Sequence, residues 1–255
     1  MEDKTPNALE DKIAELLVQA HKLPGWGVYI FETYKKFSLE YNHDIRHPID
    51  TYKVPEHIID DFAKNLIQSR RVKVALTGAG SGVIGGPLAY ATLLADIEEY
   101  LRNVYNLSLE LCYIYGVVPS PFIENIEEDE TMSLALIQKD ILLVLAMAFG
   151  TSTASTLVKE VFKQFAKKEA KEIMRKKISE KIIMKIAKEV AKIIGVKLTK
   201  KTVSKTVLRW VPVIGGVVSG GINYYSFREI AENLKTGLKR ERENYRRLLK
   251  ESGML

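Results

Sequence analysis

Hydrophobic residues recur every three or four positions along most of this chain, which is the spacing of one face of an α-helix. Residues 7–71 read as a series of N-terminal helices. The first is predicted to begin at Asn7, with Glu10 in a pattern like a capping box. The second runs from about Trp26 into the Glu40 region, and its expected buried stripe comprises Val28, Phe31, Tyr34 and Phe37.

The next part of the chain combines a glycine-rich stretch with helical periodicity. Residues 72–103 contain the glycines and then a helix predicted to end near Arg102. A further helix carries Leu107 to Tyr115 and is expected to stop at Gly116, because glycine readily adopts the left-handed conformation that ends a helix.

A second glycine-rich, apolar segment occupies residues 210–226. A charged helix follows it, from about Ser226 to Lys250. The chain has no repeat of fixed period and no linker-like change of composition. We therefore expect an all-α fold, with residues 1–255 forming a single multi-helix domain.

Glycine spacing in the two segments favours close packing of helices. Small residues four positions apart lie on one helix face and let two backbones approach without side chains between them. We therefore interpret both segments as closely packed helices. The glycines with this spacing are Gly78, Gly82 and Gly86 in the first segment and Gly216 and Gly220 in the second.

The first segment also matches a nucleotide-binding pattern. Gly80, Gly82 and Gly85 have the spacing of the dinucleotide fingerprint. That fold needs strands alternating with helices, and the rest of the chain offers almost none. Pro87 is also poorly placed in the helix that would receive the pyrophosphate. We therefore predict no cofactor.

Charge is divided unevenly along the chain. Residues 1–140 carry 13 basic and 22 acidic residues, a net charge of −9, whereas residues 141–255 carry 25 and 10, a net charge of +15. Such a division is typical of a protein with an anionic partner. Alternatively, the two halves lie beside each other and neutralise one another.

Residues 157–194 form a basic amphipathic pattern that resembles a helix attracted to an anionic lipid surface. The alternative is a helix packed on the core with a lysine-coated outer face. No nucleic-acid motif accompanies the lysines, so sequence-specific nucleic-acid binding is not expected. The candidate residues for binding an anionic surface are Lys167, Lys168, Lys171, Arg175, Lys176, Lys177 and Lys181.

Three uncharged stretches, residues 74–95, 141–158 and 210–227, approach the length of a bilayer-spanning helix. Each is diluted by glycine, proline or polar residues, so helices buried within the domain explain them better. The polar first residues lack the basic start and apolar core of a secretory signal. We therefore expect a cytoplasmic protein, peripheral at the inner face of the membrane.

Few residues suggest chemistry. His43 and His47 are four apart, but they do not form the zinc-binding H-E-x-x-H pattern, and no metal site is predicted. Cys112 lies among apolar residues and is expected to be buried. Asp96 and Asn223 lie in apolar surroundings, where a polar group needs a partner. We favour a structural role for both over ligand binding, and no catalytic residue is assigned.

Several of these motifs resemble those of the EcsC family, over about residues 60–240. The resemblance implies a mostly helical domain found in bacteria and archaea, with no established enzymatic activity. The founding member is encoded beside the subunits of an ABC transporter. The matching runs are Leu76 to Gly82, Ala95-Asp96-Ile97, Tyr115-Gly116, Val211 to Gly215 and Gly221 to Tyr224.

The leading hypothesis is a non-enzymatic helical accessory protein that docks on a membrane or a membrane complex such as a transporter. One alternative is a soluble helical protein that binds a lipid-like or small apolar ligand between its glycine-packed helices. Another is an enzyme of unknown type. The oligomeric state remains open.

Overall fold

Most of the residues that the computed structural model describes are helical. No strand occurs among those residues, which confirms the predicted all-α class. The described residues are 5–20, 23, 25, 26, 28, 30–80, 88–117, 142, 146, 182–193, 215–251, 253 and 255.

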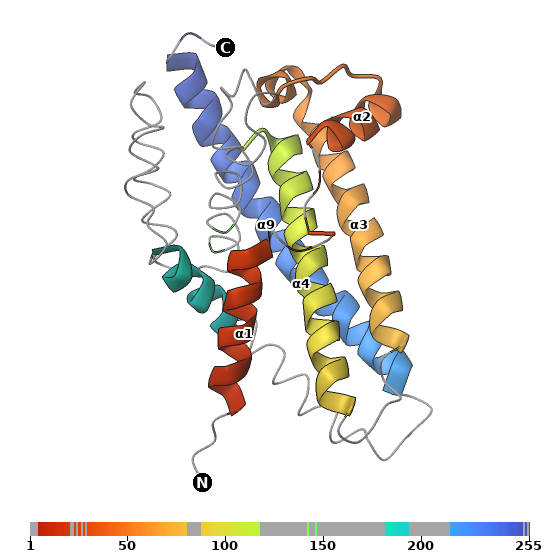
Figure 1. Ribbon diagram of the computed structural model, residues 1–255. Helices are drawn as coiled ribbons and strands as arrows, with labels where there is room; N and C mark the ends of the chain where they lie inside the picture. The colour runs from red at the N-terminus through yellow and green to blue at the C-terminus, as the bar shows by residue number, and fades with distance from the viewer. Residues whose placement is uncertain are drawn as a thin grey trace.

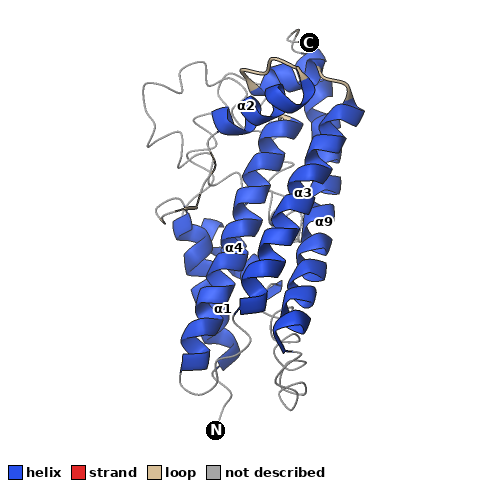
Figure 2. Ribbon diagram, turned by 90° about the vertical axis from the view of Figure 1, so that its right-hand side faces the viewer, coloured by secondary structure: helices blue, strands red, loops and turns tan. Residues whose placement is uncertain are grey.

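Three long helices, α3, α4 and α9, lie side by side and form the body of the fold (Figure 1). Figure 2 shows the same arrangement from a second direction. Helices α4 and α9 run in the same direction and α3 runs against them, while α1 and α2 pack on α4. The bounds are α1 (Thr5–Gln19), α2 (Ile30–Tyr41), the 3-10 helix η2 (Pro48–Lys53), α3 (Glu56–Gly80), α4 (Leu88–Tyr115) and α9 (Gly215–Glu251).

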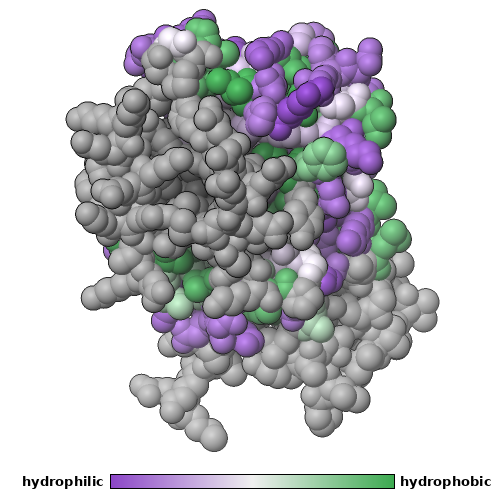
Figure 3. All heavy atoms as spheres, turned by 45° about the horizontal axis from the view of Figure 1, so that its top comes forward, coloured by the Kyte–Doolittle hydropathy of each residue, from purple (hydrophilic) through white to green (hydrophobic). Residues whose placement is uncertain are grey.

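The two ends of this bundle differ in composition. At the charged end, η2 and the start of α3 meet the last turn of α4 and residues 239–251 of α9. At the glycine-rich end lie residues 72–80 of α3, 88–95 of α4 and 215–227 of α9. Figure 3 looks obliquely onto the charged end, where the described surface is mainly hydrophilic.

The predicted starts of the first two helices need correction. Helix α1 begins at Thr5, so Asn7 lies within its first turn and is not its N-cap. Helix α2 begins at Ile30, four residues later than expected. Tyr34 and Phe37 are buried as predicted, but Phe31 is 72% exposed, because its position in the first turn of α2 faces away from the core.

The helix predicted to end near Arg102 and the one predicted from Leu107 are a single helix, α4. Three buried polar side chains lie in its interior. Because each hydrogen-bonds to a carbonyl oxygen, α4 can continue through them. Asn103 donates to Glu99 O at 2.8 Å, Ser108 to Val104 O at 2.7 Å, and Asn106 to Gly25 O at 3.1 Å.

Gly116 ends α4, as predicted. Its φ is +64°, in the left-handed region that favours glycine. The Gly116 N–H donates to Tyr113 O at 3.1 Å, and the Val117 N–H donates to Cys112 O at 3.0 Å. These two bonds are those of a Schellman motif. Cys112 itself is buried, which confirms that prediction.

Both glycine-rich segments contribute to long helices. Helix α3 continues through Gly78 to Gly80, and α9 begins at Gly215, well before the predicted start at Ser226. Gly216 and Gly220 therefore lie in α9. Gly82 and Gly86 lie outside the described residues. Close packing of these glycines, like the single-domain organisation, stays a prediction.

One part of the basic segment packs on the core. Residues 182–193 are helical, and Ile186 and Val190 are completely buried. Lys185 and Lys188 are exposed on the same helix, and Lys188 forms an ion pair with Asp11 of α1 at 2.9 Å. This part of the segment thus has the core-packed arrangement. The candidate surface-binding residues from Lys167 to Lys181 lie outside the described residues.

Replacing Gly237 by alanine should stabilise the protein by about 0.5–1 kcal/mol. Gly237 lies in the interior of α9, and an added Cβ would meet no heavy atom within 4 Å. The substitution therefore restricts the unfolded chain without creating a clash. Urea denaturation measures the change, and a destabilised variant would contradict a regular α9 at this position.

Gly116→Ala should have the opposite effect, by more than about 1 kcal/mol. The backbone there has positive φ, and an added Cβ would clash with the Thr51 hydroxyl and lie 2.8 Å from the Tyr52 ring. The same denaturation experiment tests this pair of glycines, with each variant serving as the control for the other. Equal effects would refute the assigned roles.

Candidate functional site

The two polar residues that the sequence singled out in apolar surroundings are placed on their helices, but their side-chain contacts are not described. Asp96 lies in α4 and Asn223 in α9, both toward the glycine-rich end, and their side chains lie outside the described residues. His43 and His47 lie in the segment after α2, not together on a helix. In the described part of the chain, no three or more His, Cys, Asp or Glu side chains gather as a metal site would require.

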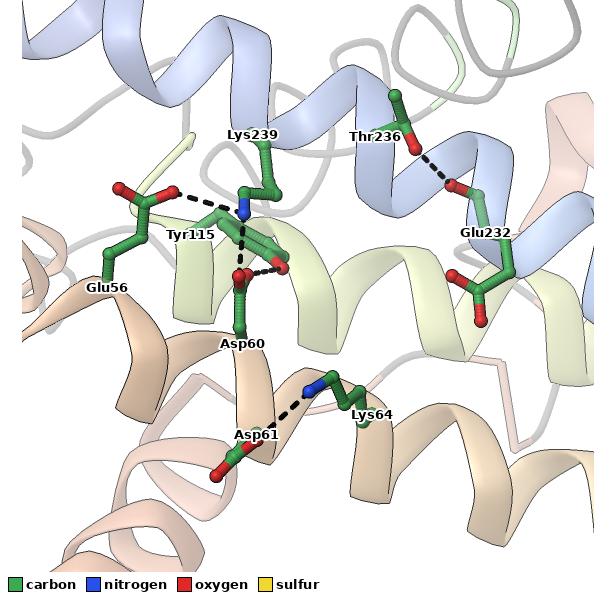
Figure 4. Close-up of polar contacts among 8 residues, drawn as sticks. All are labelled: Glu56, Asp60, Asp61, Lys64, Tyr115, Glu232, Thr236 and Lys239. Carbon is green, nitrogen blue, oxygen red and sulfur yellow. Dashed lines mark hydrogen bonds and ion pairs between the residues drawn. The ribbon is translucent and has the colours of Figure 1, made fainter.

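The described structure instead contains a polar cluster at the charged end, between α3, α4 and α9 (Figure 4). The Lys239 ammonium of α9 lies 2.6 Å from Asp60 Oδ2 and 3.2 Å from Glu56 Oε1 of α3. The Tyr115 hydroxyl of α4 donates to Asp60 Oδ1 at 2.8 Å. One carboxylate thus connects three helices.

The pKa values of the cluster favour the charged forms of its ion pair. Partial burial acts to raise the pKa of Asp60, but the hydrogen bonds from Lys239 and Tyr115 outweigh it and lower the pKa. The hydrogen bond to Asp60 raises the pKa of Lys239 despite some desolvation. Burial raises the pKa of Tyr115, and Asp60 raises it further. These shifts hold the carboxylate ionised, the ammonium charged and the phenol neutral.

Arg242 lies one turn further along α9 and is only 3% exposed. Its Nη1 donates to Tyr115 O at 2.8 Å and to Thr51 Oγ1 at 3.1 Å, and its Nη2 donates to Thr51 O at 2.7 Å. The guanidinium also lies over the Tyr52 ring, 4.5 Å from its centroid. Arg242 therefore joins α9 to the last turn of α4 and to η2.

A buried cation needs compensation, and Arg242 receives it from dipoles. Burial lowers the pKa of Arg242, but a guanidinium remains charged in proteins. Its hydrogen-bond acceptors are neutral oxygens. One of them, Tyr115 O, belongs to the C-terminal turn of α4, where the helix dipole carries partial negative charge. The position thus offsets part of the cost of burying the charge.

Two tyrosines complete the capping of α4. The Tyr34 hydroxyl of α2 donates to Tyr113 O at 3.2 Å, and the Tyr52 hydroxyl of η2 donates to Gly116 O at 3.1 Å. Burial raises the pKa of both tyrosines, so they remain donors at neutral pH. Together with Arg242, they bring donors from α2, η2 and α9 to the carbonyl oxygens of residues 113, 115 and 116 at the end of the helix.

A second ionic contact lies nearer the middle of the bundle. Arg70 of α3 makes a two-pronged contact with Glu110 of α4, with Nε 3.1 Å from Oε2 and Nη2 3.0 Å from Oε1. Both side chains are largely buried. Such a fork fixes geometry as well as charge, so it sets the register of α3 against α4.

Sequence reasoning missed these residues because charged side chains on a helix usually face solvent. One signal was present for Arg242. Together with its neighbour Glu241, it falls at helical spacing within a stripe of α9 that is otherwise apolar, and a charged residue in such a stripe needs partners. The buried residues of that stripe are Leu234, Leu238, Glu241, Arg242, Tyr245 and Leu249. The signal identifies a buried polar contact but not its partners.

The hydrogen bonds and ion pairs of this cluster have a structural role, because they hold α3, α4 and α9 together. Asp60, Lys239 and Tyr115 satisfy one another, and their pKa shifts oppose proton transfer near neutral pH. A general acid or base works best with a pKa close to the operating pH. The cluster therefore positions the helices, and it holds the charged end together.

Replacing Arg242 by methionine should destabilise the protein by about 2–4 kcal/mol. The change leaves the carbonyl oxygens of Tyr115 and Thr51 without their donors. Arg247→Met on an exposed turn of α9 is the matched control and should change stability by less than about 0.5 kcal/mol. Chemical denaturation of both variants is the measurement. Similar values for the two would contradict the capping role.

Asp60→Asn should lower stability by about 0.5–1 kcal/mol at neutral pH. The folded pKa of Asp60 lies below the unfolded value of about 3.9. Its contribution is therefore complete above about pH 5 and is lost as the pH falls through the folded pKa. The amide oxygen can still accept the Tyr115 hydrogen bond, so the variant removes the charge and the acceptor of the Lys239 ammonium.

The pH dependence of unfolding between about pH 3 and 7 tests this assignment. Asp61→Asn is the control, because Asp61 is the next residue and pairs with Lys64 on the exposed face of α3 at 3.2 Å (Figure 4). We expect a flatter acid limb for Asp60→Asn and an unchanged one for Asp61→Asn. The reverse order would overturn the assignment.

In comparisons with known proteins, no family model matches this chain, and no curated protein or solved structure is significantly similar to it. The resemblance to the EcsC family therefore stays a prediction. Among the described residues, no helix combines the length and hydrophobicity needed to cross a bilayer.

Proposed function

We propose that this protein is a non-enzymatic helical accessory protein that docks on an anionic membrane surface or on a membrane complex. The observation that carries the proposal is the presence of three uncharged helix segments at the glycine-rich end. Residues 74–80 of α3, 88–95 of α4 and 215–227 of α9 contain no Asp, Glu, Lys or Arg. All three segments lie at the same end of the bundle (Figure 1).

On α3, large apolar side chains are exposed close to this end: Val72 is 44% exposed and Leu76 is 70% exposed. Exposed apolar residues that lie together on one surface are typical of a site that contacts a membrane or another protein. The uncharged segments of α3 and α4 each rise about 10–12 Å along the helix axis. That length matches insertion into the interfacial layer of a bilayer and is far below the hydrocarbon thickness of about 30 Å.

The charge of the chain supports an anionic partner. Residues 141–255 carry a net charge of +15. The basic segment that includes Lys167, Lys171 and Arg175 supplies a second candidate contact, and each basic residue near an anionic surface contributes about 1 kcal/mol. The EcsC resemblance points the same way, since it implies a genetic link to a membrane transporter. A peripheral position at the inner face of the membrane fits these features.

Flotation with lipid vesicles tests the proposal. The full-length protein should float with vesicles that contain phosphatidylglycerol at low ionic strength and much less with pure phosphatidylcholine. High salt should weaken the binding, because screening reduces electrostatic attraction. A protein that stays in the soluble fraction under all of these conditions would refute docking on lipid.

A charge-reversal variant tests the lysines. Lys167→Glu, Lys168→Glu and Lys171→Glu together should lower the partition coefficient by about two orders of magnitude. The matched control reverses three exposed cations elsewhere, Lys35, Lys64 and Arg247. Equal loss in the two triple variants would show that only net charge matters and that the basic segment is not a specific contact.

A further inference from the structure

The solvent-facing side of α3 changes character along its length. Toward the charged end, exposed positions include Asp61, Lys64 and Gln68. Closer to the glycine-rich end, large apolar residues are exposed: Val72 is 44% exposed and Leu76 is 70% exposed. Because the two are four residues apart, they lie on one face of the helix. We call Val72 and Leu76 the apolar edge.

The sequence around the apolar edge contains no acidic residue that would repel an anionic surface. Residues 62–95 contain no Asp or Glu but carry four basic residues. One of these, Lys73, lies between the two apolar residues and is exposed. Lys64 and Arg70 pair with Asp61 and Glu110, and Arg71 is buried, so Lys73 is the basic residue that this surface presents. An exposed leucine and valine beside an exposed lysine are complementary to an anionic surface that also offers an apolar layer.

We infer that the apolar edge inserts into the interfacial layer of an anionic lipid bilayer, with the glycine-rich end facing the membrane. This inference rests on the proposed function and names the surface that performs it. Val72 and Leu76 are about 6 Å apart along the helix axis, within the insertion depth of about 5–10 Å typical of interfacial helices. The long Lys73 side chain can then reach back, so that its ammonium lies at the level of the lipid phosphates.

The direct test is Leu76→Glu, measured by flotation with phosphatidylglycerol vesicles. Removing a leucine from the interface and placing a carboxylate there should lower the partition coefficient by about tenfold or more. Leu39→Glu is a closely matched control, because Leu39 is 78% exposed on α2 at the other end of the bundle (Figure 1). Both sites are exposed, so both variants should keep the stability of the parent protein.

A fluorescence measurement reports on insertion independently of affinity. Cys112 is the only cysteine of the sequence and is buried, so a cysteine introduced at position 76 or 39 can be labelled selectively. An environment-sensitive dye at position 76 should shift to the blue on addition of vesicles and be quenched by lipid-borne quenchers. The same dye at position 39 should remain unchanged.

The outcomes separate the two proposals. If the parent protein binds no vesicle, docking on lipid and the insertion of the apolar edge both fail, and docking on a membrane complex is the part of the proposed function that stands. If it binds and Leu76→Glu behaves like Leu39→Glu, while the triple variant at Lys167, Lys168 and Lys171 loses binding, docking stands and the apolar edge is excluded. If Leu76→Glu instead dissociates a dimer seen by light scattering, the edge contacts a second copy of the chain, which overturns the inference.

Discussion

The last turn of α4 ends inside the charged end of the bundle, where its carbonyl oxygens need hydrogen-bond donors. Buried backbone carbonyls without partners are costly, so this turn determines what must surround it. Gly116 turns the chain, so that its own N–H and that of Val117 donate two of the bonds. The remaining donors come from Tyr34 of α2, Tyr52 of η2 and Arg242 of α9. One helix end thereby fixes the positions of three other elements.

The same requirement explains why a buried arginine is stable without a carboxylate in hydrogen-bond contact. The C-terminal dipole of α4 supplies partial negative charge, and the Tyr52 ring supplies an aromatic face. A lysine would provide the charge but not the planar fork that reaches Tyr115 and Thr51 together. Asp60 and Lys239, one turn away, add a second connection of α9, in this case to α3. At the charged end, α9 is therefore joined to its neighbouring elements by two separate sets of polar contacts.

The sequence was sufficient for the fold class and for features that depend on local physics. Helical periodicity predicted the all-α fold, the left-handed preference of glycine predicted the stop at Gly116, and apolar neighbours predicted the burial of Cys112. It failed where tertiary contacts override local preference. Helix α4 passes through Asn103 and Asn106 because each finds a carbonyl acceptor, one of them in a distant loop.

The polar contacts at the charged end could not be predicted from the local sequence either. Lys239 and Asp60 are far apart in the sequence, and each falls among other charged residues that face solvent. Only the fold shows which carboxylate meets which cation. Burial of Arg242 could be inferred from the sequence, because it interrupts an apolar stripe of α9. The backbone carbonyls to which it donates could not be inferred in this way. Backbone acceptors are the same for every residue type, so their positions must come from the structure.

The polar contacts that stabilise the bundle lie far from the surface that is proposed to bind the membrane. The contacts that fix the register of α3 and α9 at the charged end lie around Asp60 and Arg242, whereas Leu76 lies 16 residues further along α3, about 24 Å along its axis. Substitutions that far apart and without shared partners act independently. A bundle held at one end can thus expose apolar residues near the other without losing the alignment of its helices. Under the proposed function, the contacts at the charged end keep the helices aligned while the apolar edge binds the bilayer.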